Sequence, residues 1–258
     1  GWLYNCTVIS NSCASGLGGG VCWSILTNCI VYYNTAEGPH SEANYSGGEL
    51  IHHTCTTPLP SGGTGNITNQ PAFVNAQAGD YHLRYGSPCI DTGTNLSALI
   101  TNDLAGNPRP LDGNADGVAA FDMGAYEYNP QTADSNGDGI PDGWCLRYGL
   151  SPTANNVATN NPDGDAFNTV EEWVADTDPT NALSCFHIES LVLDPPVTVR
   201  FLSSSNRNYS LLACSSLNGG LWTNVPGQAD VRGSGGMAVL RDTNALPRRF
   251  YRVEVRVP

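Results

Sequence analysis

The chain has 258 residues, a net charge of −13 and a pI near 4.5, and its 11 basic residues are all arginine. This balance argues against binding of nucleic acid, which needs a basic footprint, and against binding of anionic membranes. Nine cysteines are more than a cytosolic protein usually carries, and no apolar run approaches the ~20 residues of a membrane helix, so we expect a secreted, extracellular or cell-surface protein.

The first third of the chain repeats itself. LYNCTVISNS (3–12) and LTNCIVYYNT (26–35) share Leu, Asn, Cys, Val and Asn at an offset of 23 residues. LIHHTCTTP is a weaker third copy that places Cys55 below Cys29. A period of this size, with alternating β-branched residues and corners rich in Gly and Asn, predicts short strands stacked as a right-handed parallel β-helix.

Stacked copies would bring like residues into ladders at the ~4.8 Å spacing of neighbouring strands. Side chains stacked in parallel are poorly aimed for a disulfide, so these cysteines should stay reduced. The first copy begins mid-repeat, which leaves an open β edge. We expect either a processed piece of a longer protein or self-association, with another chain stacking on this edge. The expected ladder pairs are Cys6 with Cys29, Asn5 with Asn28, and Asn11 with Asn34.

The repeat region lacks the residues of a sugar-cleaving enzyme. A lyase needs a base and cations that hold the sugar carboxylate, yet the first Lys or Arg is Arg84. A hydrolase needs two carboxylates across the scissile bond, yet the acids before Asp80 are three glutamates in one loop-like stretch. We therefore expect no catalytic residues. The alternative is the C-terminal fragment of a polysaccharide-degrading β-helix enzyme whose catalytic coils lie upstream.

A closing segment follows the repeats. The pieces GDYHL, GSPCIDTG, DLAGNPR and DMGAYEY resemble the terminal part of bacterial surface β-helix proteins, a region called the choice-of-anchor domain. The resemblance covers about residues 64–128 and implies that the final coils close the helix before a separate anchoring or adhesive tail. We expect Arg109 to form a buried ion pair with a carboxylate such as Asp91 or Asp122.

Within the closing segment, DGNADG alternates oxygen donors at Asp112, Asn114 and Asp116. These residues would bind calcium, with Asp122 contributing, or would form a solvated Asx turn. The spacing alone leaves both alternatives open.

Two Asp-rich loops follow, DSNGDGIPDGWC and NPDGDAFNTVEEW, and each runs into a segment with one or two predicted helical turns. With YGLSPT and ADTDPTN, the stretch of about residues 134–181 resembles the thrombospondin type-three and dockerin-like repeats found after bacterial surface domains. The resemblance implies Ca²⁺ binding, against the alternative of a flexible acidic linker. The candidate ligands are Asp134, Asn136, Asp138, the carbonyl of Ile140 and Asp142 in the first loop; Asn161, Asp163, Asp165, the carbonyl of Phe167 and Glu172 in the second; and Asp176 and Asp178 beyond it.

Both loops depart from the usual pattern. Cys145 stands where the first loop should close with Glu, so a ligand must come from elsewhere, such as Glu171, Glu172 or Asp178, or the site is weak. We interpret Cys145 as half of a disulfide with Cys185. In the second loop Ala166 stands where Gly is usual.

The C-terminal part alternates as strands, VTVRFL, YSLLACS, MAVLRD and FYRVEVRV, which predicts a small antiparallel β-sandwich. Trp222 and Tyr251 are either a sugar-binding platform or core aromatics. The predicted domains are β-helix coils and cap at 1–130, a calcium-binding linker at 131–183 and the sandwich at 184–258. The expected function is non-catalytic surface attachment or fibre assembly, on a cell surface or extracellular polysaccharide; a carbohydrate-binding module is the other alternative.

Overall fold

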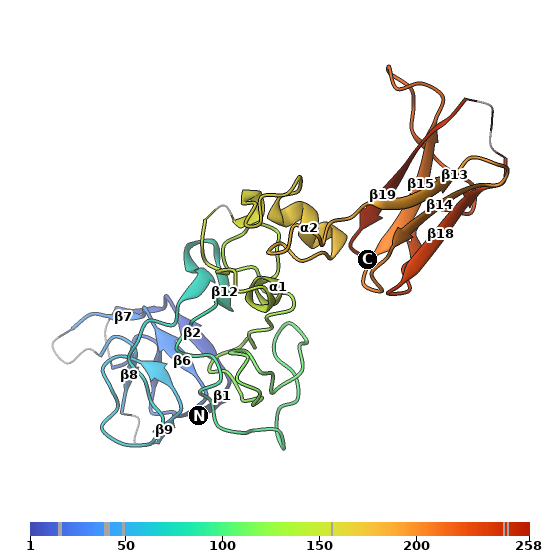
Figure 1. Ribbon diagram of the computed structural model, residues 1–258. Helices are drawn as coiled ribbons and strands as arrows, with labels where there is room; N and C mark the ends of the chain where they lie inside the picture. The colour runs from blue at the N-terminus through green and yellow to red at the C-terminus, as the bar shows by residue number, and fades with distance from the viewer. Residues whose placement is uncertain (15–16, 39–41, 48–49, 156, 245, 247) are drawn as a thin grey trace. The chain divides into compact units, whose positions relative to one another are not determined.

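The computed structural model describes residues 1–14, 17–38, 42–47, 50–155, 157–244, 246 and 248–258. In these residues the fold is mainly β, with parallel and antiparallel sheets and two α-helices (Figure 1). No helix in this part of the chain has the length and apolar character needed to cross a bilayer. The three predicted domains, with boundaries at residues 130 and 183, stay a prediction. Contacts group the chain into unit 1 (1–137, 141–146 and 151–153) and unit 2 (138–140, 147–150 and 154–258).

Unit 1 begins with short strands from successive copies of the repeat, paired in parallel. Leu3 lies opposite Leu26, and Thr7 lies opposite Ile30, which confirms the 23-residue offset. The arrangement is compatible with a β-helix-like fold. The sheets are β1 (Trp2–Tyr4), β5 (Ile25–Thr27) and β9 (Ile51–His52); β2 (Thr7–Ile9), β6 (Ile30–Tyr32) and β10 (Cys55–Thr56); β3 (Ser12–Cys13) with β7 (Thr35–Ala36); and β4 (Val21–Cys22) with β8 (Tyr45–Ser46).

The corners between these strands use left-handed backbone and asparagine ladders. Asn5, Asn28 and His53 occupy equivalent corners with φ of 48°, 54° and 44°, and asparagine tolerates this region better than most residues. Asn28 Nδ2 donates to Asn5 Oδ1 at 3.5 Å, and Asn11 Nδ2 donates to Asn34 Oδ1 at 3.0 Å. Both predicted asparagine ladders are therefore confirmed.

The cysteine ladder is confirmed for two copies and wrong for the third. The thiols of Cys6 and Cys29 hydrogen-bond to each other, which lowers the pKa of Cys6 to about 6. In the third copy, however, Cys55 lies opposite Ile30. The residue that follows Cys29 in the stack is Thr54, whose Oγ1 accepts from the Cys29 amide at 3.4 Å. Because side chains alternate between faces along a strand, this one-residue difference sends Cys55 to the other face.

The closing segment packs on the coil to form one core. It contains the antiparallel pair β11 (Phe73–Asn75) and β12 (Asp80–Leu83), joined through the short 3₁₀ helix η1 (Ala76–Ala78). The shared core shows that the coil and the closing segment fold together in unit 1. Its buried members are Ile30, Cys55, Phe73, Leu83, Cys89, Ile90, Met123 and Tyr128.

Arg109 forms a buried ion pair, as predicted, but with a different partner. Its Nη1 lies 3.0 Å from Glu127 Oε2, and both side chains are at most 1 % exposed. The guanidinium also donates to the carbonyls of Asp122 and Gly124. The predicted pairing with the carboxylate of Asp91 or Asp122 is wrong. The Asp122 carboxylate instead accepts from the Asp91 amide at 2.8 Å.

Unit 2 contains the second helix and two antiparallel sheets, and its strands confirm the predicted C-terminal strand pattern. The two sheets share a core that includes Val199, Phe201, Tyr209, Leu211 and Leu240. The predicted short helices are α1 (Asp142–Arg147), which lies in unit 1 up to Leu146, and α2 (Thr169–Ala175) in unit 2, with the 3₁₀ helix η2 (Val157–Thr159) between them in the sequence. One sheet contains β13 (Ile188–Val192), β14 (Val197–Leu202) and β18 (Met237–Asp242); the other contains β15 (Asn208–Cys214), β16 (Thr223–Asn224), β17 (Val231–Arg232) and β19 (Phe250–Arg256).

The last strand, β19, alternates between the core and the outer face. Val253 and Val255 pack against the core, as does Tyr251, while Arg252 is exposed. The Trp222 ring instead lies under the Arg252 guanidinium, 4.7 Å from its centroid. Tyr251 and Trp222 therefore belong to different faces, and the joint sugar-binding platform is wrong.

Candidate metal centre

The second Asp-rich loop is folded by hydrogen bonds from its own backbone to its polar side chains. Asn161 Oδ1 accepts from the Gly164 amide at 2.8 Å, and Asp163 Oδ1 accepts from the Asp165 amide at 3.2 Å. Asp165 Oδ1 in turn accepts from the Phe167 amide at 2.6 Å. Each aspartate thus uses one oxygen to fold the loop and keeps the other, Oδ2, for a different role.

The left-handed backbone positions of this loop explain why Ala166 is tolerated. The first loop uses Gly137 and Gly139, with φ of 73° and 87°, whereas the second uses Gly164, with φ of 74°. Ala166, which aligns with Gly139, is not among the residues with positive φ. Its Cβ therefore costs the loop nothing.

Helix α2 supplies the closing carboxylate of the second loop. Asn168 caps the helix and forms a reciprocal capping box with Glu171, whose Oε2 accepts from the Asn168 amide at 2.9 Å. This bond holds Glu171 at the helix start, while Glu172 is 1 % exposed and accepts from Thr177 Oγ1 at 3.3 Å. The N-x-x-E capping pattern is readable in the sequence and separates the two glutamates; the contact from Thr177 has no such signal.

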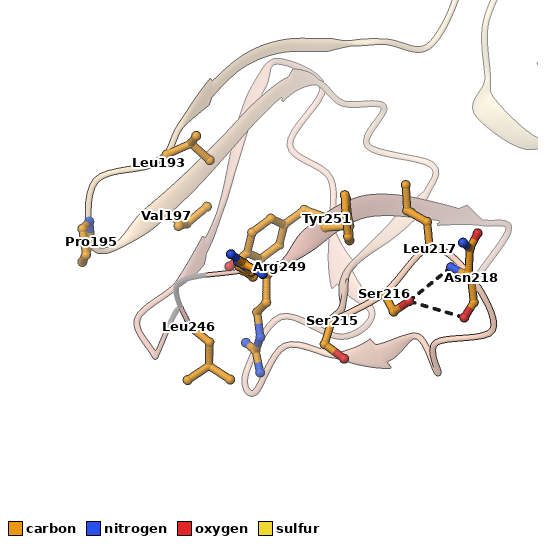
Figure 2. A pocket seen from close by; sticks show the side chains of 12 residues that line it. Leu193, Pro195, Val197, Ser215, Ser216, Leu217, Asn218, Leu246, Arg249 and Tyr251 are labelled. Carbon is orange, nitrogen blue, oxygen red and sulfur yellow. Dashed lines mark hydrogen bonds between the residues drawn. The ribbon is translucent and has the colours of Figure 1, made fainter.

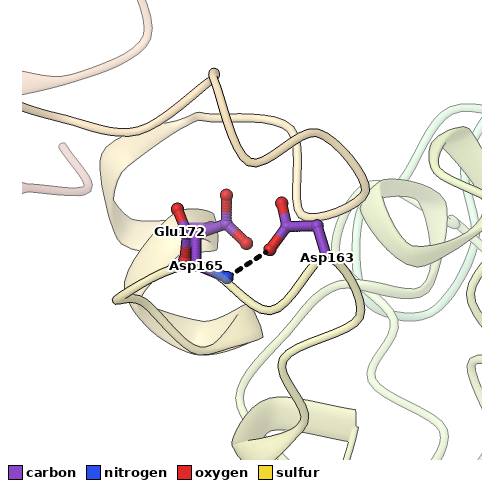
Figure 3. Close-up of side chains that lie close together, drawn as sticks. All are labelled: Asp163, Asp165 and Glu172. Atoms are coloured by element: carbon purple, nitrogen blue, oxygen red, sulfur yellow. Dashed lines mark hydrogen bonds between the residues drawn. The ribbon is translucent and has the colours of Figure 1, made fainter.

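Asp163, Asp165 and Glu172 converge on one point (Figure 3). One oxygen from each lies within 4.8 Å of the others, the sole such grouping of three or more acidic, His or Cys ligand atoms in the described chain. Asp163 Oδ2, Asp165 Oδ2 and Glu172 Oε2 are buried and accept no hydrogen bond. Burial, and then the charges of Asp163 and Asp165, raise the pKa of Glu172 to about 7. Three buried acceptors without a donor fit a divalent cation.

Asp176 and Asp178 lie outside this cluster. Asp176 ends α2 in a left-handed conformation and accepts hydrogen bonds from Ser204 Oγ and Asn206 Nδ2. Asp178 accepts from both the amide and the hydroxyl of Thr180, at 3.0 and 2.7 Å. Asp178 thus stabilises a local turn, whereas Asp176 joins the end of α2 to the segment at Ser204 and Asn206.

The first loop shows the same turn-forming bonds. Asp134 Oδ1 accepts from the Gly137 amide at 2.8 Å, and Asp138 Oδ1 accepts from the Ile140 amide at 3.0 Å. Asn136 lies between them in the sequence. These bonds fix the loop conformation, and its role as a calcium site stays a prediction.

Asp142 of the first loop is buried, and both of its carboxylate oxygens accept hydrogen bonds. Its Oδ1 accepts from the Ser135 amide at 2.8 Å, and its Oδ2 accepts from the hydroxyls of Ser135 and Tyr128, both at 2.6 Å. Cys145, at the closing position, is buried. Cys185 carries a thiol and no disulfide in this structure, so the predicted Cys145–Cys185 bond is not formed.

The DGNADG segment forms Asx turns, one of the two alternatives for it. Asp112 accepts from the amides of Asp116 and Gly117, at 3.1 and 2.9 Å. Asn114 Oδ1 accepts from the Asp116 amide at 2.9 Å, and Asp116 Oδ1 accepts from the Val118 amide at 2.8 Å. The same kind of bond folds the second Asp-rich loop, so these contacts do not decide against a cation, and calcium binding by Asp112, Asn114 and Asp116 stays a prediction.

Unit 2 also contains a cavity of about 860 Å³ (Figure 2). Its polar centre is internally satisfied, because Arg249 Nη1 lies 2.6 Å from Asp242 Oδ2 and the Tyr251 hydroxyl donates to the same oxygen at 3.0 Å. The Arg249 guanidinium is therefore already paired within the protein. Lining residues include Leu193, Pro195, Val197, Leu217, Leu246 and Phe250.

Comparisons with protein-family models, with curated proteins and with solved structures found no match for this chain. The assignment of the metal centre therefore depends on its own geometry.

Proposed function

We propose that the second loop binds one Ca²⁺ through Asp163, Asp165 and Glu172. The observation that carries this proposal is the convergence of three buried carboxylate oxygens that accept no hydrogen bond. Carboxylates are the ligands that Ca²⁺ prefers, and loops of this kind complete its coordination with a backbone carbonyl and a further side-chain oxygen. The carbonyl of Phe167 and the side chain of Asn161 stand at those positions in the sequence.

The architecture in this proposal is the end of a right-handed parallel β-helix with a choice-of-anchor-type closing region. A linker similar to thrombospondin type-three or dockerin repeats follows, and then a β-sandwich. The parallel strands at a 23-residue offset and the two antiparallel sheets around one core support it.

The role in this proposal is that of a non-catalytic extracellular protein used for surface attachment or fibre assembly. Bound Ca²⁺ neutralises an acidic, self-repelling linker and thereby stabilises it. The net charge of −13 and the placement of the acids in loops support a role for cations.

Calorimetric titration with Ca²⁺ tests the metal site. The native protein is expected to bind, and Glu172→Gln should weaken the affinity at least about tenfold, because it removes a buried ligand. Glu171→Gln is the matched control: it removes the same charge one residue away and keeps the capping pattern, so its affinity should stay within about twofold. Equal affinities for the native protein and Glu172→Gln would refute the site. A stoichiometry above one would show a second site, for which the first loop and the DGNADG segment are the candidates.

A further inference from the structure

The arginines of this acidic chain gather at its C-terminal end. Residues 184–258 contain eight arginines and five acidic residues, a net charge of +3, whereas residues 1–183 contain three arginines and nineteen acidic residues, a net charge of −16. The positive charge is thus carried by the two antiparallel sheets of unit 2, in a protein that is otherwise strongly negative.

Three of these arginines share the outer face of one sheet. Asn208 of β15 lies opposite Arg232 of β17 on one side and Arg256 of β19 on the other. At a strand spacing of about 4.8 Å, the Cα atoms of the two arginines are therefore about 10 Å apart on one face. Arg252 lies four residues earlier on β19, about 13 Å along the same face. We call Arg232, Arg252 and Arg256 the arginine face.

The charge of the arginine face is only partly neutralised within the protein. Arg256 Nη2 lies 3.0 Å from Glu254 Oε1 on the same strand. In the described part of the chain, no carboxylate oxygen lies within 4.0 Å of the guanidinium of Arg232 or Arg252. The Arg252 guanidinium instead stacks on the half-buried Trp222 ring at 4.7 Å. With Glu254 included, the three arginines keep a net charge of +2, and the exposed Asp230, two residues before Arg232, adds one negative charge nearby.

We propose that the arginine face binds an acidic polysaccharide through its repeating carboxylate or sulfate groups. Guanidinium groups bind planar and tetrahedral anions bidentately, and spaced cations on a flat sheet suit an extended chain with regularly spaced anions. The side chain of Asn208 stands between two of the arginines and offers hydrogen bonds to hydroxyl groups. The proposal depends on the extracellular role above for its choice of partner, but it does not depend on the metal centre.

Charge selects this partner over other polyanions. Nucleic acids and anionic bilayers present dense negative charge, which the −16 of residues 1–183 would repel. A single extended glycan chain needs only one sheet face for contact, whereas a duplex or a bilayer presents a broad charged surface.

Binding to immobilised polygalacturonate and to immobilised dextran sulfate tests the proposal and separates the carboxylate from the sulfate source, with neutral dextran as the blank. The native protein should bind at least one of the two acidic polymers. The double variant Arg232→Gln/Arg252→Gln should bind that polymer about tenfold more weakly. The matched control is Arg200→Gln/Arg241→Gln, which removes two exposed arginines from the other sheet, and its affinity should stay within about twofold.

A second variant protects the test against loss of structure. Arg232→Glu leaves Trp222 and its stacked arginine untouched, and it should weaken binding at least as much as the double variant. The proposal would be overturned if the control variant lost as much affinity as the double variant, or if Arg232→Glu bound the polymer fully. It would also be overturned if the native protein bound neither polymer, or bound duplex DNA equally tightly. The metal site is tested separately. If the native protein still binds the polymer in the presence of a chelator, polymer binding does not depend on Ca²⁺, and a failure of either proposal leaves the other standing.

Discussion

Arg207 lies directly before strand β15 and contacts the end of α2, so its replacement should destabilise unit 2 strongly. The side chain is 4 % exposed, and its guanidinium lies 4.5 Å from the centroid of the Trp173 ring. Its Nε donates to the carbonyl of Val174 at 2.8 Å, and its Nη2 donates to the carbonyl of Trp173. Both carbonyls belong to the last turn of α2, where the usual helical donors are missing, and the Trp173 carbonyl also accepts from the C-cap amide of Asp176 at 3.2 Å.

The expected loss in the free energy of unfolding for Arg207→Gln is about 3–5 kcal/mol. Each hydrogen bond from a charged donor contributes about 1.5–3 kcal/mol, and the stacking on Trp173 adds about 1 kcal/mol. The weak ion pair with Asp176, at 3.8 Å, adds little. The two hydrogen bonds share one planar group, so the total is expected to lie below the simple sum.

Denaturant unfolding followed by tryptophan fluorescence, in saturating Ca²⁺, measures this loss. Arg200→Gln is the control, because its side chain is exposed on β14 and its replacement should change stability by less than about 0.5 kcal/mol. Arg207→Lys should lose most of the same free energy, since a single ammonium cannot reproduce the planar fork. A loss below about 1 kcal/mol for Arg207→Gln would refute the claim that this side chain joins α2 to the sheet.

Two further predictions concern buried charges. Arg109→Ala leaves Glu127 buried without its partner, so the free energy of unfolding of unit 1 should fall by about 3–5 kcal/mol in thermal or denaturant unfolding; a change below 1 kcal/mol would contradict the ion pair. Burial acts to raise the pKa of Asp242, but hydrogen bonds from the Asn244 amide, Arg249 and Tyr251 outweigh it and lower the pKa. The lowered pKa stabilises the folded state above the ordinary aspartate pKa, and this contribution is lost as the pH falls through the folded value. The stability difference between the native protein and Asp242→Asn should therefore shrink below about pH 4, and a difference that stays constant between pH 6 and pH 2 would contradict this account.

The strands of unit 1 were predictable from the sequence, but the third register was not. The first two copies align by identical residues at a fixed offset of 23, and the strands pair in that register. The second and third copies are 25 residues apart, since Leu26 pairs with Ile51. Matching cysteine to cysteine then places Cys55 one position out of register, and only the pairing of backbone atoms reveals this.

Partners of charged residues were harder to predict than the residues themselves. A buried ion pair for Arg109 follows from the cost of burying a lone charge, but the choice of Glu127 over Asp91 and Asp122 depends on how the closing segment folds back. Likewise, Asp176 and Asp178 are acidic residues of the kind that bind calcium. The Asp178 side chain instead forms a local turn with Thr180, and the Asp176 side chain bonds to the distant Ser204.

The two Asp-rich loops show which part of the sequence pattern determines a metal site. Asp134 with Gly137 forms the same bond as Asn161 with Gly164. Asp138 with Ile140 likewise matches Asp165 with Phe167. The alternating pattern therefore encodes a turn, which needs only side-chain acceptors and backbone donors. Among the ligand positions that differ, the second loop has Asp163 where the first has Asn136, and the helix that follows presents Glu172 in the second loop and Cys145 in the first. The turn geometry is thus shared by both loops, and the convergence of three carboxylate oxygens without a hydrogen-bond donor depends on Asp163 and on the closing Glu172.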